Sequence, residues 1–429
     1  MNDPAPLVLD VTRLMSRLGR GPLTGVDRVE AVWLDRVCAP LPDGALRPDI
    51  FGLVRSRAGF LLLNQSGLRG LQALLAGAPL PPADWLSWLL HRSKPEAARA
   101  ETALRRLSVA RSGRLGLGRM LRRVLPQGFA YLNLGHANLT PRSLAAIKAG
   151  GASVRAVLLH DVLPLDYPQF ARQGTVARFQ RKLQAVSQEA DLVIHSAEAT
   201  RLLNEAQLAR SGRVPEGLVA SLGMARPAAL PEPSVPPFTP ERRYFVMLGT
   251  IEPRKNHAFL LKIWRKMLNE LPQDAVPGLV ILGRRGWENE AVFAALDDLG
   301  PLTPFIREIG GADDAQVRAL MAGSEGLLFP SFAEGFGLPP LEAAALGLPV
   351  YLPPLPIYRE TLGDYPVYLE LDDDYSWIKA LTGPRAMPAE PPVLPQWEAH
   401  FAIVEAGLRQ AGWGAQVGDK TLNARGALA

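Results

Sequence analysis

Two glutamates enclose a glycine-containing segment in the second half of the chain. From residue 334 to residue 342 the sequence reads Glu-Gly-Phe-Gly-Leu-Pro-Pro-Leu-Glu. Carboxylates accept hydrogen bonds from vicinal hydroxyls, glycines let backbone amides approach a ligand, and a helix N-terminus favours an anion such as a diphosphate. The two prolines suit the first turn of a helix. The candidate ligand contacts in this segment are Glu334, Gly335, Phe336, Gly337, Leu338 and Glu342.

Each glutamate alone has a simpler interpretation. Glu334 would be a solvated loop residue, and Glu342 would be a first-turn acid that complements the helix dipole. Only the combination with the glycines and the helix start favours a binding site, with Glu334 also a candidate catalytic residue.

A basic pair follows the apolar run that ends at Gly249. In Val246-Met-Leu-Gly-Thr-Ile-Glu-Pro-Arg-Lys-Asn-His257, Arg254 and Lys255 come just beyond the predicted strand. Phosphoryl oxygens accept charge-assisted hydrogen bonds from such cations, so both are candidate binding and catalytic residues. The alternative is an exposed basic turn.

Three further short segments carry candidate residues. Gly283 and Arg284 follow the apolar run from 279 to 282, although a surface arginine is ordinary. Gly25 lies between Thr24 and Val26, and a glycine lets a backbone amide approach a ligand. His160 follows the run Ala156 to Leu159, and His136 and His195 also follow apolar runs; a lone histidine is more often a structural residue.

Short apolar runs that alternate with amphipathic stretches of helical length must position these residues. Such runs are typical of parallel strands covered on both faces, which predicts a doubly wound α/β class. In such sheets ligands bind beyond the carboxyl ends of the strands. A proline-dense stretch divides the chain and predicts a linker. The predicted divisions are a first domain at 1–225, a linker at 226–240, a second domain at 241–395, and a C-terminal helix and tail at 396–429.

The segment from Pro330 to Val350 resembles the E-x7-E region of retaining glycosyltransferases of family 4, within the group 1 glycosyltransferases. The Glu-Pro-Arg-Lys-Asn run resembles the donor-phosphate clamp of a mannosyltransferase-like subgroup. The His160-Asp-x-x-Pro segment is also similar to the family, which implies that His160, ahead of His136 and His195, contacts a sugar or acceptor hydroxyl. The run from 279 to 287 looks like the family's next strand and loop, which implies that Gly283 approaches the nucleotide and Arg284 its base or ribose. Gly25 stands in a segment that resembles the family's glycine-bearing loop, which implies that its amide meets the distal phosphate of the donor. The resemblance implies a GT-B fold, in which two Rossmann-like domains face each other across a cleft. It further implies a nucleotide-sugar donor held by the second domain, an acceptor held by the first, front-face transfer with retention, and no required metal or tightly bound cofactor.

The sequence departs from the family pattern in two segments near the predicted site. Residues 24–28 keep one glycine and Arg28 where relatives have Gly-Ile-Gly-Arg, and Arg28 could be a surface charge or a ligand contact. Residues 358–364 replace a Pro-Glu-x-x-Gly segment, so Glu360 is expected to brace the loop after Val350-Tyr-Leu. The resemblance favours GDP-mannose as donor, with UDP- or dTDP-sugars possible, and a lipid-linked or polysaccharide acceptor in bacterial surface-glycan synthesis.

The amino-acid composition excludes several classes of protein and suggests where this one acts. The single Cys38 excludes an internal disulfide and a cysteine metal cluster, and the sequence has neither a signal peptide nor a long apolar span, so we expect a cytoplasmic protein. The net charge is +5, and Arg92 to Arg123 contains ten Arg or Lys against two acids. This stretch predicts either contact with an anionic membrane, on the inner face of the cytoplasmic membrane, or a solvated insertion. It lacks the aromatic residues that stack on bases, which argues against nucleic acid.

Two other functions stay open on the sequence alone. A sugar-nucleotide epimerase or hydrolase could share the fold, and so could a catalytically idle subunit that binds nucleotide sugars. Turnover of donor without acceptor would identify the former, and nucleotide binding without turnover the latter.

Overall fold

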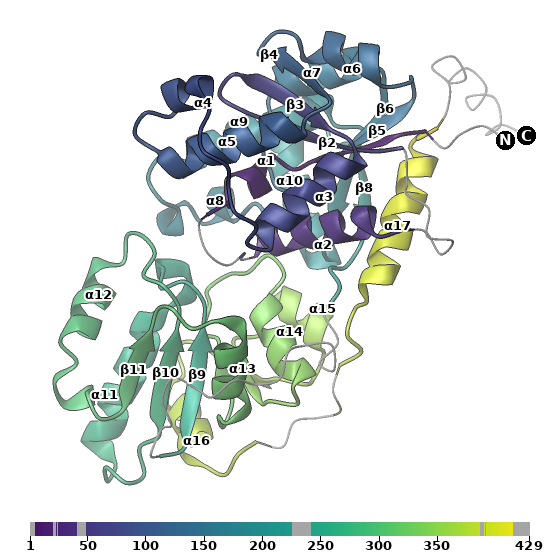
Figure 1. Cartoon of the computed structure of the whole chain (residues 1–429). Coiled ribbons are helices and arrows are strands. Elements are labelled where there is room, and N and C mark those ends of the chain that lie inside the picture. The colour runs from purple at the N-terminus through teal and green to yellow at the C-terminus, as the bar shows by residue number, and fades with distance from the viewer. Residues whose placement is uncertain are drawn as a thin grey trace, which may run out of the picture.

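The computed structural model describes residues 5–19, 23, 25–40, 49–224, 242–386, 390 and 392–414. Within these residues the chain forms two β-sheets, each flanked by helices (Figure 1). Strands of the first sheet lie between residues 7 and 219, and strands of the second between 244 and 368. The predicted linker at 226–240 lies outside the described residues.

The first sheet has eight strands in the order β4-β3-β2-β1-β5-β6-β7-β8. Their bounds are β1 Leu7–Asp10, β2 Ile50–Arg55, β3 Gly59–Leu63, β4 Ala110–Gly113, β5 Phe129–Asn133, β6 Ala152–Leu158, β7 Leu192–His195 and β8 Glu216–Val219. All neighbouring pairs are parallel except those of β3, which is antiparallel to both β2 and β4. The chain reverses between β2 and β3 in three residues, too few for a helical crossover, so this edge differs from the uniformly parallel sheet that the sequence predicts.

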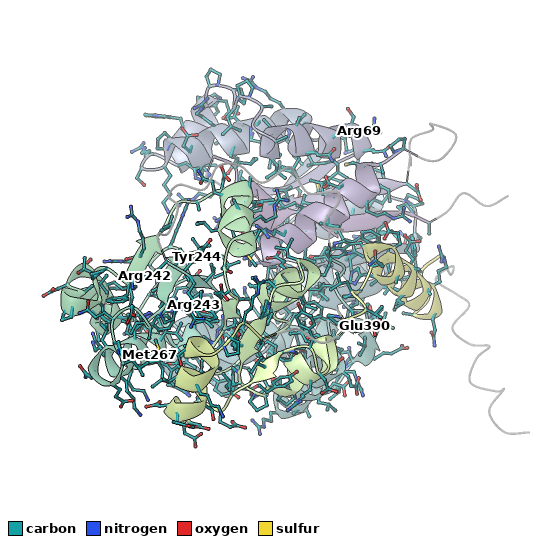
Figure 2. The ribbon with its side chains drawn as sticks, turned by 90° about the horizontal axis from the view of Figure 1, so that it is seen from below. Arg69, Arg242, Arg243, Tyr244, Met267 and Glu390 are labelled. Atoms are coloured by element: carbon teal, nitrogen blue, oxygen red, sulfur yellow. The ribbon has the colours of Figure 1, made fainter. Side chains whose placement is uncertain are left out.

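The second sheet has six strands in the order β11-β10-β9-β12-β13-β14, and all its pairs are parallel. Their bounds are β9 Tyr244–Leu248, β10 Gly278–Leu282, β11 Ile306–Ile309, β12 Leu327–Leu328, β13 Val350–Leu352 and β14 Val367–Tyr368. The central strands are buried over nearly their whole length, which is why the sequence shows continuous apolar runs there. Figure 2 labels Arg243, which directly precedes β9 and whose guanidinium donates to the carbonyls of Leu381 and Gly383 at 3.0 Å each.

Helices cover both sheets and make the connections between most parallel strands. In the first part they are α1 Thr12–Met15, α2 Val26–Cys38, α3 Gln65–Leu75, α4 Trp85–Leu90, α5 Pro95–Leu107, α6 Leu117–Val124, α7 Pro141–Ala149, α8 Leu163–Asp166, α9 Thr175–Glu189 and α10 Glu198–Ser211. In the second they are α11 His257–Glu270, α12 Glu290–Asp297, α13 Asp314–Ala322, α14 Leu338–Ala345, α15 Pro356–Leu362, α16 Asp374–Thr382 and α17 Trp397–Gln410. Short 3-10 turns η1, η3 and η4 span Pro168–Phe170, Pro253–Lys255 and Gly300–Leu302.

The last described helix, α17, returns to the first sheet instead of packing on the second (Figure 1). The indole Nε1 of Trp33 donates to Nε2 of His400 at 3.1 Å, and the two side chains are almost fully buried. A Cβ on Gly407 would lie 2.6 Å from Leu218 of β8, so the helix backbone lies directly against the strand. Helix α17 lies within the predicted C-terminal segment at 396–429 and carries the chain from the second sheet back to the first; residues 415–429 lie outside the described residues.

The basic stretch is folded. It contains α5, the edge strand β4 and α6, and its apolar residues mostly face the core, since Leu104, Leu117 and Leu121 are fully buried or nearly so. Leu115 and Val109 are exceptions, at 79% and 51% exposed. Across the described chain, none of the helices combines the length and apolarity needed to cross a bilayer.

Candidate functional site

Glu334 lies between the two cations that the sequence singles out. Its Oε1 atom is 2.6 Å from Nζ of Lys255 and 2.6 Å from a guanidinium nitrogen of Arg254. A second carboxylate, Glu252, is 2.6 Å from the other terminal nitrogen of Arg254. All four side chains are largely buried, so these charges are weakly screened and strongly coupled. The structure thus brings the two predicted motifs into one ion cluster.

A tight turn after β9 presents the two cations. Gly249 directly follows the strand with a φ of 144°, the 3-10 turn η3 carries Arg254 and Lys255, and Asn256 precedes α11 with a left-handed φ of 60°. The ammonium of Lys255 lies 4.1 Å from the ring centroid of Phe329, which ends the run containing β12. Cation–π attraction and the Glu334 bond therefore hold Lys255 at the carboxyl edge of the sheet.

The pKa of Glu334 is set by two opposing effects, burial and the neighbouring cations. Burial would raise the pKa, but the neighbouring Lys255 and Arg254 cations outweigh burial and lower it below the ordinary value of 4.5. Glu334 is therefore ionised at neutral pH and neutralises cations that would otherwise be available to a phosphate.

The helix after the Glu334 loop begins as predicted. Gly337 is its N-cap at a φ of 83°, which a residue with a side chain adopts at a cost, and α14 ends two residues before Gly347. Pro339 and Pro340 lie in the first turn and contribute no N–H groups. Backbone donors for an anion are thus concentrated at Gly337 and Leu338, while the helix dipole still favours negative charge there.

Glu342, one turn into α14, contacts the first domain. Its Oε1 is 3.2 Å from a guanidinium nitrogen of Arg28 on α2, and the other terminal nitrogen of Arg28 is 2.8 Å from Asp314 at the start of α13. Arg28 is therefore a cross-domain ion-pair partner in this structure. Glu342 is separate from the Glu334 ion cluster, and burial raises its pKa while Arg28 opposes the rise.

The Gly335 backbone lies in direct contact with the first domain. A Cβ on Gly335 would lie 2.9 Å from Oδ2 of Asp161 and 3.3 Å from the carbonyl oxygen of His160. The carbonyl of Gly335 accepts a 2.6 Å hydrogen bond from the Thr200 hydroxyl on α10. His160, Asp161 and Thr200 thus meet the Glu334 loop directly.

We expect Gly335→Ala to displace the Glu334 loop from the first domain, because the added methyl would lie 2.9 Å from Oδ2 and 3.0 Å from Cβ of Asp161. A displacement of about 1 Å can cost about 100-fold in rate, so we expect a loss of up to that order in transfer activity. Gly311→Ala is the control and should keep wild-type transfer, since a Cβ on Gly311 meets nothing within 4 Å. Equal transfer rates for the two variants would contradict this role.

His160 lies at the predicted strand end and is 8% exposed. Its Nε2 is 2.7 Å from the carbonyl oxygen of Leu134, so Nε2 carries the proton and Nδ1 is left as an acceptor. Burial lowers the pKa of His160 to about 4, which keeps the ring neutral near pH 7. The ring of His136 lies 5.1 Å from it, centroid to centroid. The neutral His160 ring can accept a hydrogen bond from a hydroxyl through Nδ1, but it carries no positive charge that could stabilise an anion.

The remaining predicted residues lie at strand or helix ends. Gly25 is the N-cap of α2 at a φ of 47°, with open space where a Cβ would lie. Gly283 packs against Gly249, since a Cβ on Gly283 would lie 1.8 Å from the carbonyl oxygen of Gly249. This close backbone packing is enough to require glycine at position 283. Arg284 is exposed and donates to the Gly310 carbonyl at 3.3 Å, outside the Glu334 ion cluster.

Three residues of this region had no predicted part in binding. Asp161 and Thr200 contact the Glu334 loop, and Glu360 bridges the domains instead of bracing its own loop. Its carboxylate accepts 2.7 Å hydrogen bonds from the amides of Glu198 and Ala199 at the start of α10. Only Asp161 had a usable signal, its position beside His160 at a strand end. No group of three or more His, Cys, Asp or Glu is arranged to hold a metal ion in the described part of the chain.

The two-sheet architecture, with both carboxyl edges meeting at this site, defines a GT-B protein. A solved structure of the trehalose-6-phosphate protein from E. coli, bound to UDP-2-fluoro glucose, superposes with a TM-score of 0.54. The superposition covers 95% of this chain and 96% of that one at 14% identity, so it establishes the fold alone.

Residues 232–367 match the family model described as "Glycosyl transferases group 1". The matched range is about a third of the chain, and it contains both cations and both glutamates of the predicted site. The "Serotype-specific mannosyltransferase WbdA" of Escherichia coli is 28% identical over 248 residues, which is 54% of this chain and 30% of that protein. The "O-antigen chain mannosyltransferase B" of Escherichia coli is 36% identical over 121 residues, 28% of this chain and 31% of that one. The chain thus spans less than a third of the length of these relatives.

Proposed function

We propose that the protein transfers a hexose, of the mannose type, from a nucleoside-diphosphate sugar to a lipid-linked or polysaccharide acceptor in bacterial surface-glycan synthesis. The observation that carries the proposal is the buried cluster of Arg254, Lys255 and Glu334 beside the N-terminus of α14. Buried cations at a helix start suit a diphosphate leaving group. The match of this same range to the group 1 glycosyltransferases supports the assignment.

In the proposed reaction the diphosphate of the donor replaces Glu334 as the partner of Arg254 and Lys255. The bond between the anomeric carbon and the diphosphate oxygen breaks, and the two cations stabilise the charge that develops on that oxygen. The acceptor hydroxyl attacks from the same face, so configuration is retained, and the departing phosphate takes its proton. His160 accepts a hydrogen bond from a sugar hydroxyl through Nδ1.

Two comparisons guide the choice of donor. The relatives named above are mannosyltransferases of O-antigen or serotype-specific glycans, which favours GDP-mannose. The structural neighbour holds a UDP-sugar, so a uridine donor is the second candidate. Glu342 would hold ribose hydroxyls after releasing Arg28, and Gly25 would offer its amide to the distal phosphate. Gly283 and Arg284 would approach the nucleoside from the neighbouring strand end.

The test combines binding with turnover. We expect GDP to raise the melting temperature of the protein, and to raise it more than UDP does; a tie or the reverse order would contradict the mannose-type donor. Transfer of labelled mannose from GDP-mannose to lipid extracts of a surface-glycan-producing bacterium tests the reaction itself. Binding without transfer to any acceptor would favour the non-catalytic subunit, and donor breakdown without acceptor would favour the epimerase or hydrolase.

Location in the cytoplasm and attachment to its membrane stay predictions. The surface that attachment would use includes Trp85 and Trp88 of α4, at 75% and 59% exposure, and Arg92 of the basic stretch, whose guanidinium carbon lies 5.8 Å from the Trp88 ring centroid. Exposed tryptophans next to cations are typical of proteins that lie on an anionic membrane.

A further inference from the structure

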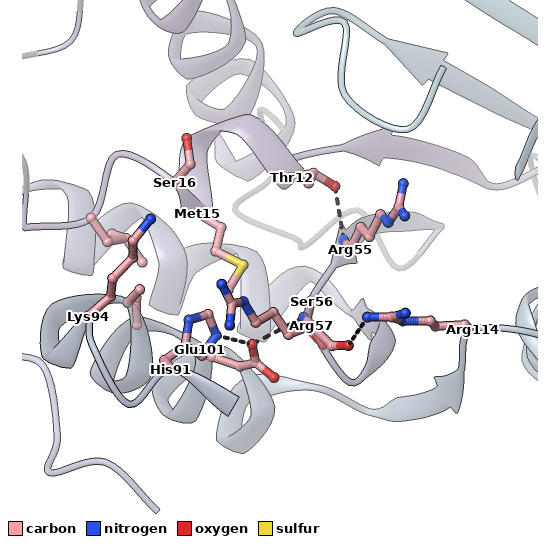
Figure 3. Close-up of a pocket in the computed structure, with 13 residues that line it drawn as sticks. Thr12, Met15, Ser16, Arg55, Ser56, Arg57, His91, Lys94, Glu101 and Arg114 are labelled. Carbon is pink, nitrogen blue, oxygen red and sulfur yellow. Dashed lines mark hydrogen bonds and ion pairs between the residues drawn. The ribbon is translucent and has the colours of Figure 1, made fainter. Parts of the chain in front are cut away.

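A separate cavity of about 410 Å³ lies in the first domain. Its volume falls in the usual range for small-ligand sites, roughly 300 to 1,000 Å³. The residues that line it are Thr12, Met15, Ser16, Leu18, Arg55, Ser56, Arg57, His91, Lys94, Ala97, Ala100, Glu101 and Arg114 (Figure 3). None of them belongs to the predicted donor site.

The cavity opens at the edge of the sheet that also carries His160. Thr12 follows β1, Arg55 ends β2 and Arg114 follows β4, and these three strands run in the same direction as β5 and β6. Asp10 at the end of β1 pairs in register with Asn133 at the end of β5. The cavity therefore lies on the acceptor side of the proposed transfer reaction, along one sheet edge from His160.

Positive charge dominates the lining. Arg55, Arg57, Lys94 and Arg114 are all exposed side chains at the cavity, and in the described part of the protein none of the four forms an ion pair. Figure 3 shows Lys94 on one side of the cavity and Arg55 and Arg114 on the other, with Arg57 between them. Like charges gathered without counter-charge repel one another, and an anion relieves that repulsion.

The one carboxylate of the lining is already engaged. Glu101 is fully buried, and its Oε2 is 2.7 Å from Nε2 of His91 and 3.2 Å from the backbone nitrogen of Arg57. Arg57 also donates from its guanidinium to the Leu90 carbonyl, and Arg114 donates to the Arg57 carbonyl at 3.3 Å. These bonds fix the turn between β2 and β3 and leave the other cations of the lining without a carboxylate partner.

We propose that this cavity binds the phosphate or diphosphate ester group of the acceptor, at a site distinct from the donor diphosphate. Arginine and lysine side chains supply charge-assisted donors, and the hydroxyls of Thr12 and Ser16 supply neutral ones. The thirteen lining residues include no Phe, Tyr or Trp, so the site offers no stacking surface for a nucleobase. That the ligand is the acceptor rests on the proposed function; that it is a phosphoryl group rests on the cavity alone.

The surroundings of the cavity favour a phosphoryl group attached to a lipid. His91 directly follows α4, on which Trp85, Trp88 and Leu89 are 75%, 59% and 41% exposed. An apolar chain that leaves the cavity over α4 would cover these side chains. A lipid-borne diphosphate and a soluble phosphate ester share the same anchoring chemistry and differ only in whether α4 contributes.

Calorimetric titration of the full chain with inorganic pyrophosphate tests the site. We compare wild type, the double variant Arg55→Met/Lys94→Met, the donor-site variant Lys255→Met and the control Arg123→Met, an exposed arginine of the same basic stretch that is not in the lining. Loss of two charge-assisted contacts should weaken binding at the cavity by about tenfold or more. Lys255→Met should retain pyrophosphate binding at the cavity and lose pyrophosphate binding at the donor site.

Equal pyrophosphate binding by the double variant and Arg123→Met would overturn the proposal. Arg55 and Lys94 have exposed side chains, so we expect both variants to fold; melting curves check this, and Lys94→Gln alone should show an intermediate loss. Failure of the donor assignment gives a different pattern. GDP would then not bind in a way that depends on Lys255, while pyrophosphate would still bind at the cavity.

Farnesyl diphosphate distinguishes the two sources of the phosphoryl group. Tighter binding than pyrophosphate, lost in Trp88→Ser as well as in the double variant, supports a lipid-borne ligand. Equal affinities, lost only in the double variant, support a soluble phosphate ester. In transfer assays the double variant should raise the KM for the acceptor by about tenfold or more and leave the KM for the donor unchanged.

Discussion

Lys255→Met is expected to reduce the rate of sugar transfer by about 100- to 1,000-fold, the effect of removing one preorganised charge from a developing oxyanion. Methionine keeps most of the length of the side chain and its contact with Phe329, so the loss reports on the ammonium rather than on packing. The change should appear in kcat as well as in kcat/KM, because the diphosphate carries its greatest charge as it leaves.

Lys262→Met is the matched control on the adjoining helix α11. Its ammonium is 2.6 Å from Asp374, but the side chain is 54% exposed, and such surface pairs contribute little to stability. We expect near wild-type transfer from this variant. Comparable transfer rates for Lys255→Met and Lys262→Met would remove the diphosphate role from the cation cluster.

Glu334→Gln is expected to destabilise the free protein and yet to increase the stabilisation that a nucleoside diphosphate gives. Removing the carboxylate charge leaves Arg254 and Lys255 buried and under-neutralised, a loss that typically costs about 3 to 5 kcal/mol. A bound diphosphate would restore the missing negative charge, so GDP should raise the melting temperature of Glu334→Gln more than that of wild type.

The pH dependence of unfolding gives a second measure of the same pair. Since the pKa of Glu334 is lowered on folding, its stabilising contribution is present above the ordinary value of 4.5 and is lost as the pH falls through the lowered pKa. Glu334→Gln should lack this part of the acid dependence, whereas Glu290→Gln, on the exposed start of α12, should keep it.

GDP-mannose separates the counter-charge role of Glu334 from contact with the sugar. If Glu334 also holds sugar hydroxyls, the advantage of GDP-mannose over GDP in melting temperature should shrink in Glu334→Gln. A smaller GDP response in the variant than in wild type would instead show that Glu334 does not compete with the diphosphate.

The apolar periodicity of the sequence determined the α/β class and most central strands. Tyr244–Leu248 and Gly278–Leu282 are buried on both faces and therefore appear as unbroken apolar runs. Local chemistry also determined the start of α14, because Gly337 and the two prolines restrict the backbone whatever surrounds them. The edge hairpin of β2 and β3 was harder to predict, since its pairing depends on a chain reversal and on neighbours far along the sequence.

By itself, the sequence determined which residue types stand at which strand ends, since carboxyl-end positions follow from the order of strands along the chain. Glu334, Arg254, Lys255 and His160 could be named that way. Only the tertiary structure decided which residues pair with one another. Glu334 forms ion pairs with Arg254 and Lys255, and Arg28 of the first domain pairs with Glu342. Asp161 and Thr200 contact Gly335. Pairings between residues 79 to 314 positions apart are set by how the two sheets pack, and no local pattern encodes that packing.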